Sequence, residues 1–317
     1  MGEPVVARLD KHLYIAFMKN ILVITGGAGF IGSNLIELLL KKTKYNIISI
    51  DNYSSGLKNN HILNNRVNYL KGDTIDFFKH FNKIKKKIKT IFHFAEFSRI
   101  FQSFKKISEC LDSNIHGTAE LFKFALLNKI KLVYSATSAS LGNNGKDMNL
   151  SPYSFTKAKN LELLENLKKW FNLKYEIVYF YNVYGPRQIS KGDMATVVGI
   201  FEEHFKNKKP FPVVRPGSQT RKFTHVKDTV NACIFAWNKN QCRHYSVASN
   251  KSYSIIELAK MFGGKIKYLP ERCGERFLSS EKAMNFKNRI IKIKAKIKIQ
   301  DYIYFFLKKS TKFTLQR

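Results

Sequence analysis

The chain has 317 residues, of which 44% are hydrophobic, and it carries a formal net charge of +32 at pH 7. This length and apolar content suffice for one large domain or two closely packed ones, and they exclude an intrinsically disordered protein. The four cysteines, Cys110, Cys233, Cys242 and Cys273, lie far apart without a CxxC pair. The sequence therefore indicates neither a disulfide framework nor a zinc site, and a reducing cytoplasm is the expected location.

The positive charge has two interpretations. It can mark a surface for nucleic acid or an anionic membrane, or it can reflect a composition rich in Lys, Asn and Ile. Only 11 of the 55 basic residues are Arg, although Arg is the residue that reads phosphates and bases with paired hydrogen bonds. We therefore expect no specific nucleic-acid partner, although the surplus charge favours anionic ligands.

No apolar run approaches the ~20 residues of a membrane span, so no transmembrane segment is expected. Residues 1–17 carry Asp10 and Lys11 in their middle and lack the apolar core and cleavage site of a secretion signal. We expect Met18 to be the natural start and residues 1–17 to be a non-native or upstream extension outside the fold.

Alternating strands and helices fill the first half of the chain. Residues 20–25 (NILVIT) form a β-branched run that ends at glycines, and residues 31–40 follow with the apolar spacing of a helix. Further strands are expected near residues 46–50, 67–70, 90–94, 131–135 and 175–180. This order predicts an α/β fold of the Rossmann type, a doubly wound parallel sheet with helices on both faces.

After about residue 182 the pattern becomes irregular and predicts a smaller C-terminal lobe that caps the sheet. Helices are expected over residues 194–205, 226–237 and 254–262, and strands over residues 243–247 and 291–299, where Ile or Ala alternates with Lys. The expected organisation is a Rossmann-type domain over residues 18–182 and a lobe over residues 183–317. A segment of about residues 224–250 is expected to return to the first domain.

The turn after the first strand reads TGGAGFIG. Gly26, Gly29 and Gly32 permit a tight turn that brings a pyrophosphate close to the backbone, at the positive end of the following helix. Phe30 and Ile31 lie at the start of that helix and are included among the expected cofactor contacts. Strand, glycine turn and helix together are the context that makes this motif a dinucleotide site.

Acidic residues follow the next two strands. Asp51 lies 19 residues after Gly32, where its carboxylate can accept both hydroxyls of a ribose and would repel a 2′-phosphate, so the expected cofactor is NAD and not NADP. Asn52 is a further expected contact. Asp73 and Thr74 end the third strand, where Asp73 can reach the adenine or can instead stabilise the turn.

Tyr153 and Lys157 lie four residues apart in YSFTK, at the start of a predicted amphipathic helix, so they share one face. A nearby cation favours the phenolate of a Tyr, whose ordinary pKa is ~10, and brings it into range as a general base. The loop YSATSASLG after the fifth strand adds the hydroxyls of Thr137 and Ser138 but no carboxylate.

These motifs resemble those of the extended short-chain dehydrogenases/reductases that act on nucleotide sugars. The likeness runs from about Lys19 to about Leu307 and rests on TGGAGFIG, IDNYSSG, GDTID, FHFAE, NIHGT, YSATSASLG, SPYSFTK, YNVYGPRQ, GSQTRKFTHVKD and ERCGER. The resemblance implies that Tyr153 is the acid/base and that Lys157 binds the nicotinamide ribose and lowers the pKa of the Tyr. It also implies that Thr137 bridges the substrate and Tyr153.

Within that family, nucleotide-sugar 4,6-dehydratases and related decarboxylases carry Asp-Glu or Ser-Glu after this Thr, whereas this chain has Ser138 and Ala139. Elimination therefore lacks its carboxylate, and the pattern resembles the UDP-hexose 4-epimerases.

The resemblance implies a homodimer through two helices, here residues 107–127 and 153–171. Residues Leu111, Ile115, Leu164 and Trp170 suit either a dimer or packing on the sheet.

The family pattern also implies substrate contacts. Asn182, Arg221 and Arg272 match positions that hold the nucleotide diphosphate, and Arg offers paired donors to phosphate oxygens. Ser279 matches the position beside the 2-substituent of the sugar, where a small residue leaves room for an N-acetyl group. UDP-N-acetylglucosamine is therefore the expected substrate, with UDP-glucose as a second one.

The chain departs from the family pattern in several places. Glu96 stands where many members have Ala near the cofactor, and residues common in the family are replaced by Cys273, Lys222, Tyr179 and Leu141. His93 is expected to pack at a strand end. Two alternatives stay open: another nucleotide-sugar enzyme (a dehydratase, a reductase or a different epimerase), or a non-catalytic nucleotide-binding protein with a basic surface for RNA or membrane.

Overall fold

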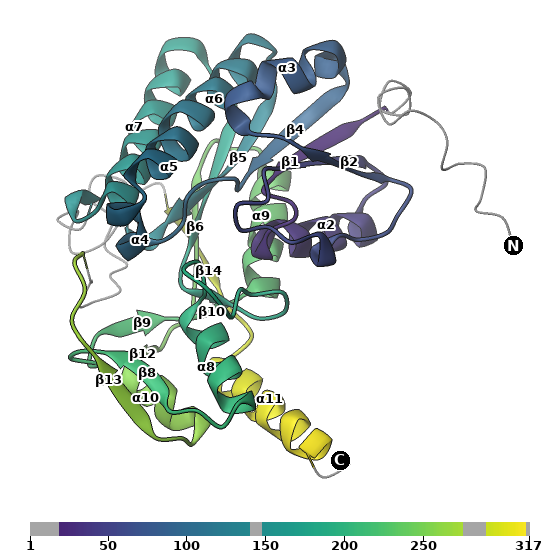
Figure 1. Cartoon of the computed structure of the whole chain (residues 1–317). Coiled ribbons are helices and arrows are strands. Elements are labelled where there is room, and N and C mark those ends of the chain that lie inside the picture. The colour runs from purple at the N-terminus through teal and green to yellow at the C-terminus, as the bar shows by residue number, and fades with distance from the viewer. Residues whose placement is uncertain (1–18, 140–147, 275–289, 315–317) are drawn as a thin grey trace, which may run out of the picture.

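The computed structural model describes residues 19–139, 148–274 and 290–314, with side chains of the last helix as far as Ser310. Eight strands in these ranges form one sheet in the order β14-β11-β6-β5-β4-β1-β2-β3, and every neighbouring pair is parallel (Figure 1). The strands are β1 (Ile21–Thr25), β2 (Asn46–Asp51), β3 (Val67–Lys71), β4 (Ile88–His93), β5 (Lys131–Thr137), β6 (Tyr175–Phe180), β11 (His244–Ala248) and β14 (Ile290–Lys294).

Helices cover both faces of this sheet (Figure 1). Alternate residues of β1 point to opposite faces, so Ile21 and Val23 enter one core and Leu22 and Ile24 the other. The first core is shared with α3 (Phe77–Phe81), α6 (Thr118–Leu127) and α7 (Pro152–Phe171), and the second with α2 (Phe30–Lys42) and α9 (Val226–Lys239). The doubly wound parallel sheet predicted from the sequence is confirmed.

Shorter elements connect these layers. The remaining helices are α4 (Ile100–Lys105), α5 (Ile107–Leu111), the π-helix η5 (Asp112–Gly117), α8 (Val197–Lys206), α10 (Ile255–Phe262), α11 (Ile299–Thr314) and the 3₁₀ turns η2 (Lys58–Asn60), η3 (Thr74–Asp76) and η4 (Asn82–Lys87). The remaining strands are β7 (Val183–Tyr184), β8 (Phe211–Val214), β9 (Thr220–Lys222), β10 (Thr224–His225), β12 (Ser252–Ser254) and β13 (Ile266–Leu269). Among the helices of the described ranges, none combines the length and apolarity that crossing a bilayer requires.

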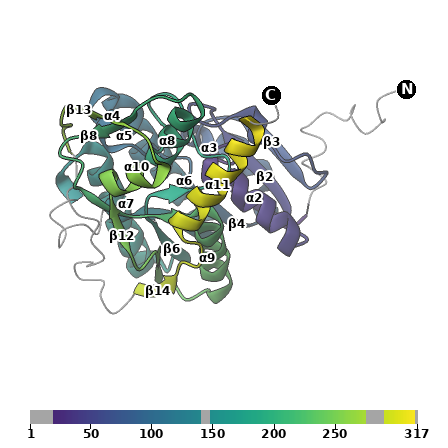
Figure 2. The same cartoon turned by 90° about the horizontal axis from the view of Figure 1, so that it is seen from below.

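A smaller lobe lies below the sheet and contains α8, α10, α11 and the strand pairs β8–β13 and β9–β12 (Figures 1 and 2). It has a core of its own, in which Phe201, Phe211, Leu258 and Ile303 are buried. Helix α10 begins at a capping box in which Ser254 and Glu257 bond each other's backbone N–H groups. The lobe is thus a packed unit that holds its strands and loops beside the carboxyl ends of the main sheet.

Two segments differ from the sequence prediction. The expected strand over residues 291–299 ends at Lys294, because Asp228 on α9 accepts the N–H groups of Lys296 and Ile297, both at 2.9 Å, and turns the chain out of the sheet into α11. The expected helix over residues 107–127 is divided into α5, the π-helix and α6. Such π-helical turns often occur at functional sites.

Candidate active site

The carboxyl ends of β1 and β4 are the point where the strand order reverses, since the chain runs from β1 to β2 and β3 on one side and from β4 to β5 and β6 on the other. Ligands of open α/β sheets bind at such a point. The two loops are joined by Thr25 Oγ1, which accepts the N–H groups of Phe94 and Ala95, both at 3.0 Å. The glycine turn and the loop that carries Glu96 therefore form one edge.

The glycine turn has no room for side chains. A Cβ on Gly32 would lie 2.2 Å from the carbonyl oxygen of Gly26, and a Cβ on Gly26, which has φ of +72°, would lie 3.0 Å from Ala95 N. Gly29 caps α2 without a side-chain hydrogen bond, and Phe30 and Ile31 form its first turn. The backbone N–H groups of the first turn of α2 have no acceptor within the helix and are thereby left for an anion such as a pyrophosphate.

Asp51 lies at the end of β2 with 6% of its surface exposed. Its two carboxylate oxygens accept the N–H groups of Ala28 (3.0 Å) and Tyr53 (2.9 Å). Burial raises the pKa of this carboxyl, and the two backbone hydrogen bonds act in the opposite direction. Each oxygen keeps a further lone pair that can accept a ribose hydroxyl.

Asn52 and Asp73 lie side by side, because Asn52 Nδ2 donates to Asp73 Oδ2 at 2.9 Å. Asp73 also accepts the N–H of Ile75 at 3.2 Å and caps η3. Both readings of Asp73 are thus compatible with its position, since it stabilises a turn beside the expected adenine site. Thr74 is buried, and a Cβ on Gly117 of the π-helix would lie 2.1 Å from its hydroxyl oxygen.

Tyr153 stands in the first turn of α7, which begins at Ser151 and Pro152. The Ser151 hydroxyl accepts the N–H of Ser154 at 3.1 Å, and Pro152 at the first helical position favours the helix start. The backbone N–H of Tyr153 donates to Ser103 Oγ of α4 at 3.2 Å. The local sequence therefore fixes the position at which the Tyr153 side chain projects from α7, one turn before that of Lys157.

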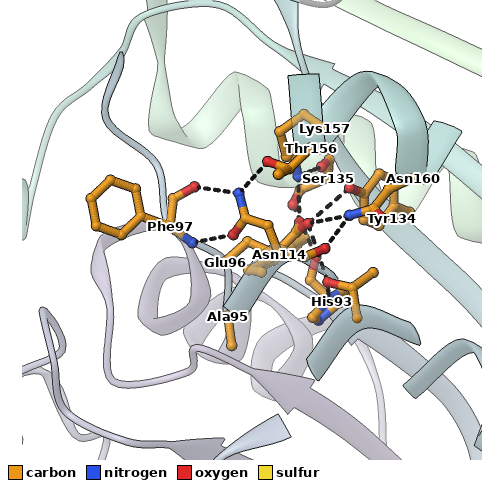
Figure 3. Close-up of polar contacts among 12 residues, drawn as sticks. His93, Ala95, Glu96, Phe97, Asn114, Tyr134, Ser135, Thr156, Lys157 and Asn160 are labelled. Carbon is orange, nitrogen blue, oxygen red and sulfur yellow. Dashed lines mark hydrogen bonds and ion pairs between the residues drawn. The ribbon is translucent and has the colours of Figure 1, made fainter. Parts of the chain in front are cut away.

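Lys157 is 4% exposed, and its ammonium donates to Glu96 Oε2 and to the carbonyl oxygen of Ser135 in β5 (Figure 3). It also lies 4.3 Å from the centre of the Tyr134 ring. Burial lowers the pKa of Lys157, whereas the Glu96 carboxylate raises it. The expected ribose-binding lysine is thus one half of a buried ion pair, which the sequence motif does not reveal.

Two asparagines brace this pair (Figure 3). Asn160 Nδ2, one turn after Lys157, donates to Glu96 Oε1 at 3.1 Å and to the Asn114 carbonyl at 2.6 Å. Asn114, in the π-helix, accepts the N–H of Phe97 at 2.6 Å and donates to Thr156 Oγ1 at 3.0 Å. The loop after β4, the π-helix and α7 are therefore held together by side chains at the site.

The fifth-strand loop begins with buried residues. Thr137 and Ser138 are 9% and 5% exposed at the carboxyl end of β5, and Thr137 Oγ1 accepts the N–H of Ala139 at 3.2 Å. Leu141 lies outside the described residues.

His93 is fully buried between the hydroxyls of Thr25 (2.8 Å) and Thr118 (2.9 Å), and burial lowers its pKa to about 4. Its position agrees with the expected packing role.

The expected substrate residues come from the lobe and its hinges. Asn182 follows β6 with φ of +35°, and its side chain donates to the Lys222 carbonyl of β9 at 3.0 Å, beside Arg221. Arg272 is exposed and its guanidinium lies 5.3 Å from the centre of the Phe101 ring in α4. Asn182 and Arg221 thus lie together at β9 and Arg272 lies against α4, while Ser279 lies outside the described residues.

Arg99 is a cation that the motifs do not single out. Its guanidinium donates to the Met194 carbonyl at 3.0 Å and to the Ser98 carbonyl at 2.9 Å, and within the described ranges it forms no ion pair with a carboxylate. Burial lowers its pKa, and the nearby Tyr153 counteracts this shift. A cation beside the expected base, with no carboxylate partner in the part of the chain that the structure describes, is a feature that arises only on folding.

Comparisons with known proteins now define the family. The model of a family described as the NAD dependent epimerase/dehydratase family matches residues 22–248. The chain belongs to this family. Its cofactor is accordingly NAD, and the glycine turn and Asp51 fit that dinucleotide.

Relatives with different named activities resemble the chain. A Methanocaldococcus jannaschii protein provisionally named UDP-glucose 4-epimerase is 27% identical over 80% of this chain and 87% of its own length. Human dTDP-D-glucose 4,6-dehydratase is 30% identical over 77% of this chain and 73% of its own. The solved structure of a UDP-N-acetylglucosamine 4-epimerase from Methanobrevibacter ruminantium, in complex with UDP-N-acetylmuramic acid, has a TM-score of 0.77 and 25% identity, covering 95% of this chain and all of that one. Family membership therefore leaves epimerase and dehydratase to be distinguished by the site.

Proposed function

We propose that the protein is an NAD-dependent 4-epimerase of a UDP-hexose. The observation that carries the proposal is the set at the carboxyl end of β5, where Tyr153 and Lys157 stand one helical turn apart beside a loop with hydroxyl and methyl groups at Thr137, Ser138 and Ala139. Such a set can move a proton on and off a sugar hydroxyl.

The cofactor is held by backbone and carboxylate groups. The N–H groups at the N-terminus of α2 suit its pyrophosphate, and Asp51 suits the adenosine ribose. Lys157 is the donor for the second ribose. Bound NAD supplies reversible oxidation at C4 of the sugar, which makes and then removes a 4-keto group.

Tyr153 takes the proton of the 4-hydroxyl and returns it to the same oxygen after the sugar has turned about its diphosphate, when the hydride held by bound NAD would return to the opposite face of C4. Thr137 shares the hydrogen bond between the sugar oxygen and Tyr153. Arg221, Arg272 and Asn182 hold the nucleotide diphosphate, so binding energy from the nucleotide keeps the substrate in place while the sugar rotates. The net reaction inverts C4 and leaves the cofactor unchanged.

Dehydration is the main competing reaction because a dehydratase is among the relatives. Removing water needs an additional acid or base next to the keto sugar. Ser138 and Ala139 provide none, and the Glu96 carboxylate is occupied by Lys157, Tyr134 and Asn160. This arrangement favours epimerisation.

For the sugar, we propose UDP-N-acetylglucosamine with UDP-glucose as a second substrate, because the small side chain of Ser279 leaves room for an N-acetyl group.

We also propose a homodimer through α5, α6 and α7. Leu111 and Trp170 are 38% and 63% exposed and support it, whereas Leu164 is fully buried in the sheet core and is unavailable for a partner.

The experiment incubates the purified protein, without added cofactor and then with NAD, with UDP-N-acetylglucosamine and separately with UDP-glucose, and follows the sugar anomeric signals by proton NMR. The expected result is the matching galacto sugar. A 4-keto-6-deoxy product would instead make the protein a dehydratase, and no change of either sugar would reject both substrates.

A second experiment removes the hydroxyl of Tyr153 and, as a matched control, that of Tyr175. Tyr153→Phe should lower turnover by about 10²- to 10⁴-fold, the usual contribution of a general acid/base, while NAD binding is retained. Tyr175→Phe, in which the phenol that donates to Glu165 at 2.7 Å is removed from a buried position on β6, should keep turnover. Near-normal turnover of Tyr153→Phe would reject the assignment of the base.

A further inference from the structure

The carboxylate of Glu96 accepts hydrogen bonds from four side chains. Lys157 donates to Oε2, and Tyr134 OH (2.9 Å), Asn160 Nδ2 (3.1 Å) and Thr118 Oγ1 (3.3 Å) donate to Oε1, while only 3% of the side chain is exposed (Figure 3). An ionised carboxylate accepts about four such bonds. Because the side chain is almost completely buried and its four donors all belong to the protein, Glu96 is not placed to act on a substrate, and its influence passes through Lys157.

Lys157 needs such a partner. An ammonium that is 4% exposed loses most of its hydration, which by itself favours the neutral amine. Glu96 and the Ser135 carbonyl replace two of the three water contacts and leave one N–H of the ammonium for another acceptor. The pair also lies at the edge of the sheet where the cofactor binds, since a Cβ on Gly26 would lie 3.0 Å from the backbone nitrogen of Ala95, the residue before Glu96.

We propose that Glu96 is a positioning residue of the active site, which keeps Lys157 as an ammonium ion and holds it against β5 so that its remaining N–H faces the nicotinamide ribose. The proposal rests on the proposed role of Lys157 in the epimerase site. In this chain the lysine would otherwise be buried alone, and Tyr134 and Asn160 serve to orient the carboxylate.

The other titratable groups that face the pair stay in one form near neutral pH. His93 from β4 has a pKa lowered to about 4 by burial, Cys110 from α5 has one raised to about 11, and burial raises the pKa of Tyr134 from β5 well above its usual value. Among the described residues, Tyr153 on α7 is the remaining titratable neighbour, and it acts on Tyr134. Its titration is removed when each variant is also measured in a Tyr153→Phe background.

The test measures NAD binding by calorimetry between about pH 7 and about pH 9, where an ordinary lysine stays charged. The wild-type dissociation constant should be constant across this range. In Glu96→Gln, Lys157 should lose its proton within or below the range, because its burial is no longer compensated. At the high-pH end of the range, NAD should then bind to Glu96→Gln at least about fivefold more weakly than it binds to the wild type or to the same variant at the low-pH end. The reason is that a charged donor bonds about twice as strongly as a neutral one.

Glu165→Gln is the matched control. Glu165 is also a buried carboxylate, on the same helix, and it contacts His244 at 2.6 Å and Tyr175 at 2.7 Å. Its loss should lower stability without changing NAD affinity with pH. An NAD affinity of Glu96→Gln that equals the wild type at every pH would overturn the proposal, as would a fivefold loss shared by both variants.

If Glu96→Gln does not fold, Glu96→Asp replaces it, because it keeps the charge but shortens the reach to Lys157. It should weaken NAD binding at all pH values without adding a pH dependence, and wild-type affinity would overturn the proposal. The binding assay does not use sugar turnover. An absence of epimerase activity in the wild type would therefore reject the proposed function while the role of Glu96 is still decided by the cofactor.

Discussion

The carboxylate of Asp51 accepts the backbone N–H of Ala28 at 3.0 Å and so joins the end of β2 to the glycine turn after β1. A Cβ on Gly56 would lie 2.8 Å from both carboxylate oxygens, so the following loop also closes on this group. The residue expected to hold the adenosine ribose is thereby part of the framework of the pyrophosphate turn. Changes at Asp51 should affect both parts of the cofactor site.

Asp51→Asn should weaken NAD binding, because an amide nitrogen would face a backbone N–H that now donates to a carboxylate. The wild type should lose NAD affinity as the pH falls and Asp51 takes up a proton. Since burial raises the pKa of Asp51, this loss should begin at a higher pH than for a carboxyl with the ordinary value of 3.8. Calorimetric titrations with NAD over the acidic range check both effects, and an equal acid dependence in Asp51→Asn would contradict them.

Gly32→Ala should destabilise the protein by about 1–3 kcal/mol, the usual cost of overpacking, and abolish NAD binding. Its Cβ would lie 2.2 Å from Gly26 O, a backbone atom that cannot move without opening the turn. Gly29→Ala is the graded control, since its Cβ would lie 3.1 Å from the same atom. Thermal melting with and without NAD measures the difference, and equal melting temperatures for the two variants would contradict the packing argument.

Arg221→Ala should raise the KM for the UDP-sugar by about tenfold or more, the expected effect of losing charge-assisted hydrogen bonds, with little effect on NAD affinity. Lys222→Ala is the control, because it removes a cation from the next position of the same strand, on the opposite face. Steady-state kinetics at fixed ionic strength separate the two. A similar KM increase in both variants would indicate general attraction by the basic surface and not a specific phosphate contact.

The sequence predicts the features that depend on neighbouring residues. The strand, glycine turn and helix around Gly29, the acid at Asp51 and the spacing of Tyr153 and Lys157 are all encoded within short segments. The contact of Lys157 with Glu96 joins residues 61 positions apart, and no local pattern contains it. The signal that could have indicated it was the acid in FHFAE, three residues after the end of the buried strand β4 and at the edge of the sheet where the cofactor motifs lie.

Element ends were less predictable for the same reason. The alternating pattern of Ile and Lys continues past Lys294, but contacts with Asp228 on a distant helix end β14 there. Likewise, the apolar spacing of residues 107–127 does not reveal the π-helix, whose Asn114 is fixed by Phe97 and Thr156. Hydrogen bonds between separate elements decide these boundaries.

Arg99 leads to the last prediction, which concerns the charge near Tyr153. Because Glu96 neutralises Lys157, the cation beside Tyr153 that has no carboxylate partner among the described residues is Arg99. Its positive charge favours the phenolate form of Tyr153. Arg99→Met should therefore move the acidic limb of the kcat profile to higher pH, because the base then needs a higher pH to lose its proton.

The control for this substitution is Arg66→Met. Arg66 also donates to backbone carbonyls, those of Thr43 and Leu40, both at 2.6 Å, but it lies beside the end of α2. Both variants lose a guanidinium that holds backbone, so both should be less stable, and only Arg99→Met should shift the acidic limb. Coincident limbs in the wild type and Arg99→Met would show that Arg99 only holds the loop at Met194, and that the charge on Tyr153 is set by the Lys157 pair and the cofactor.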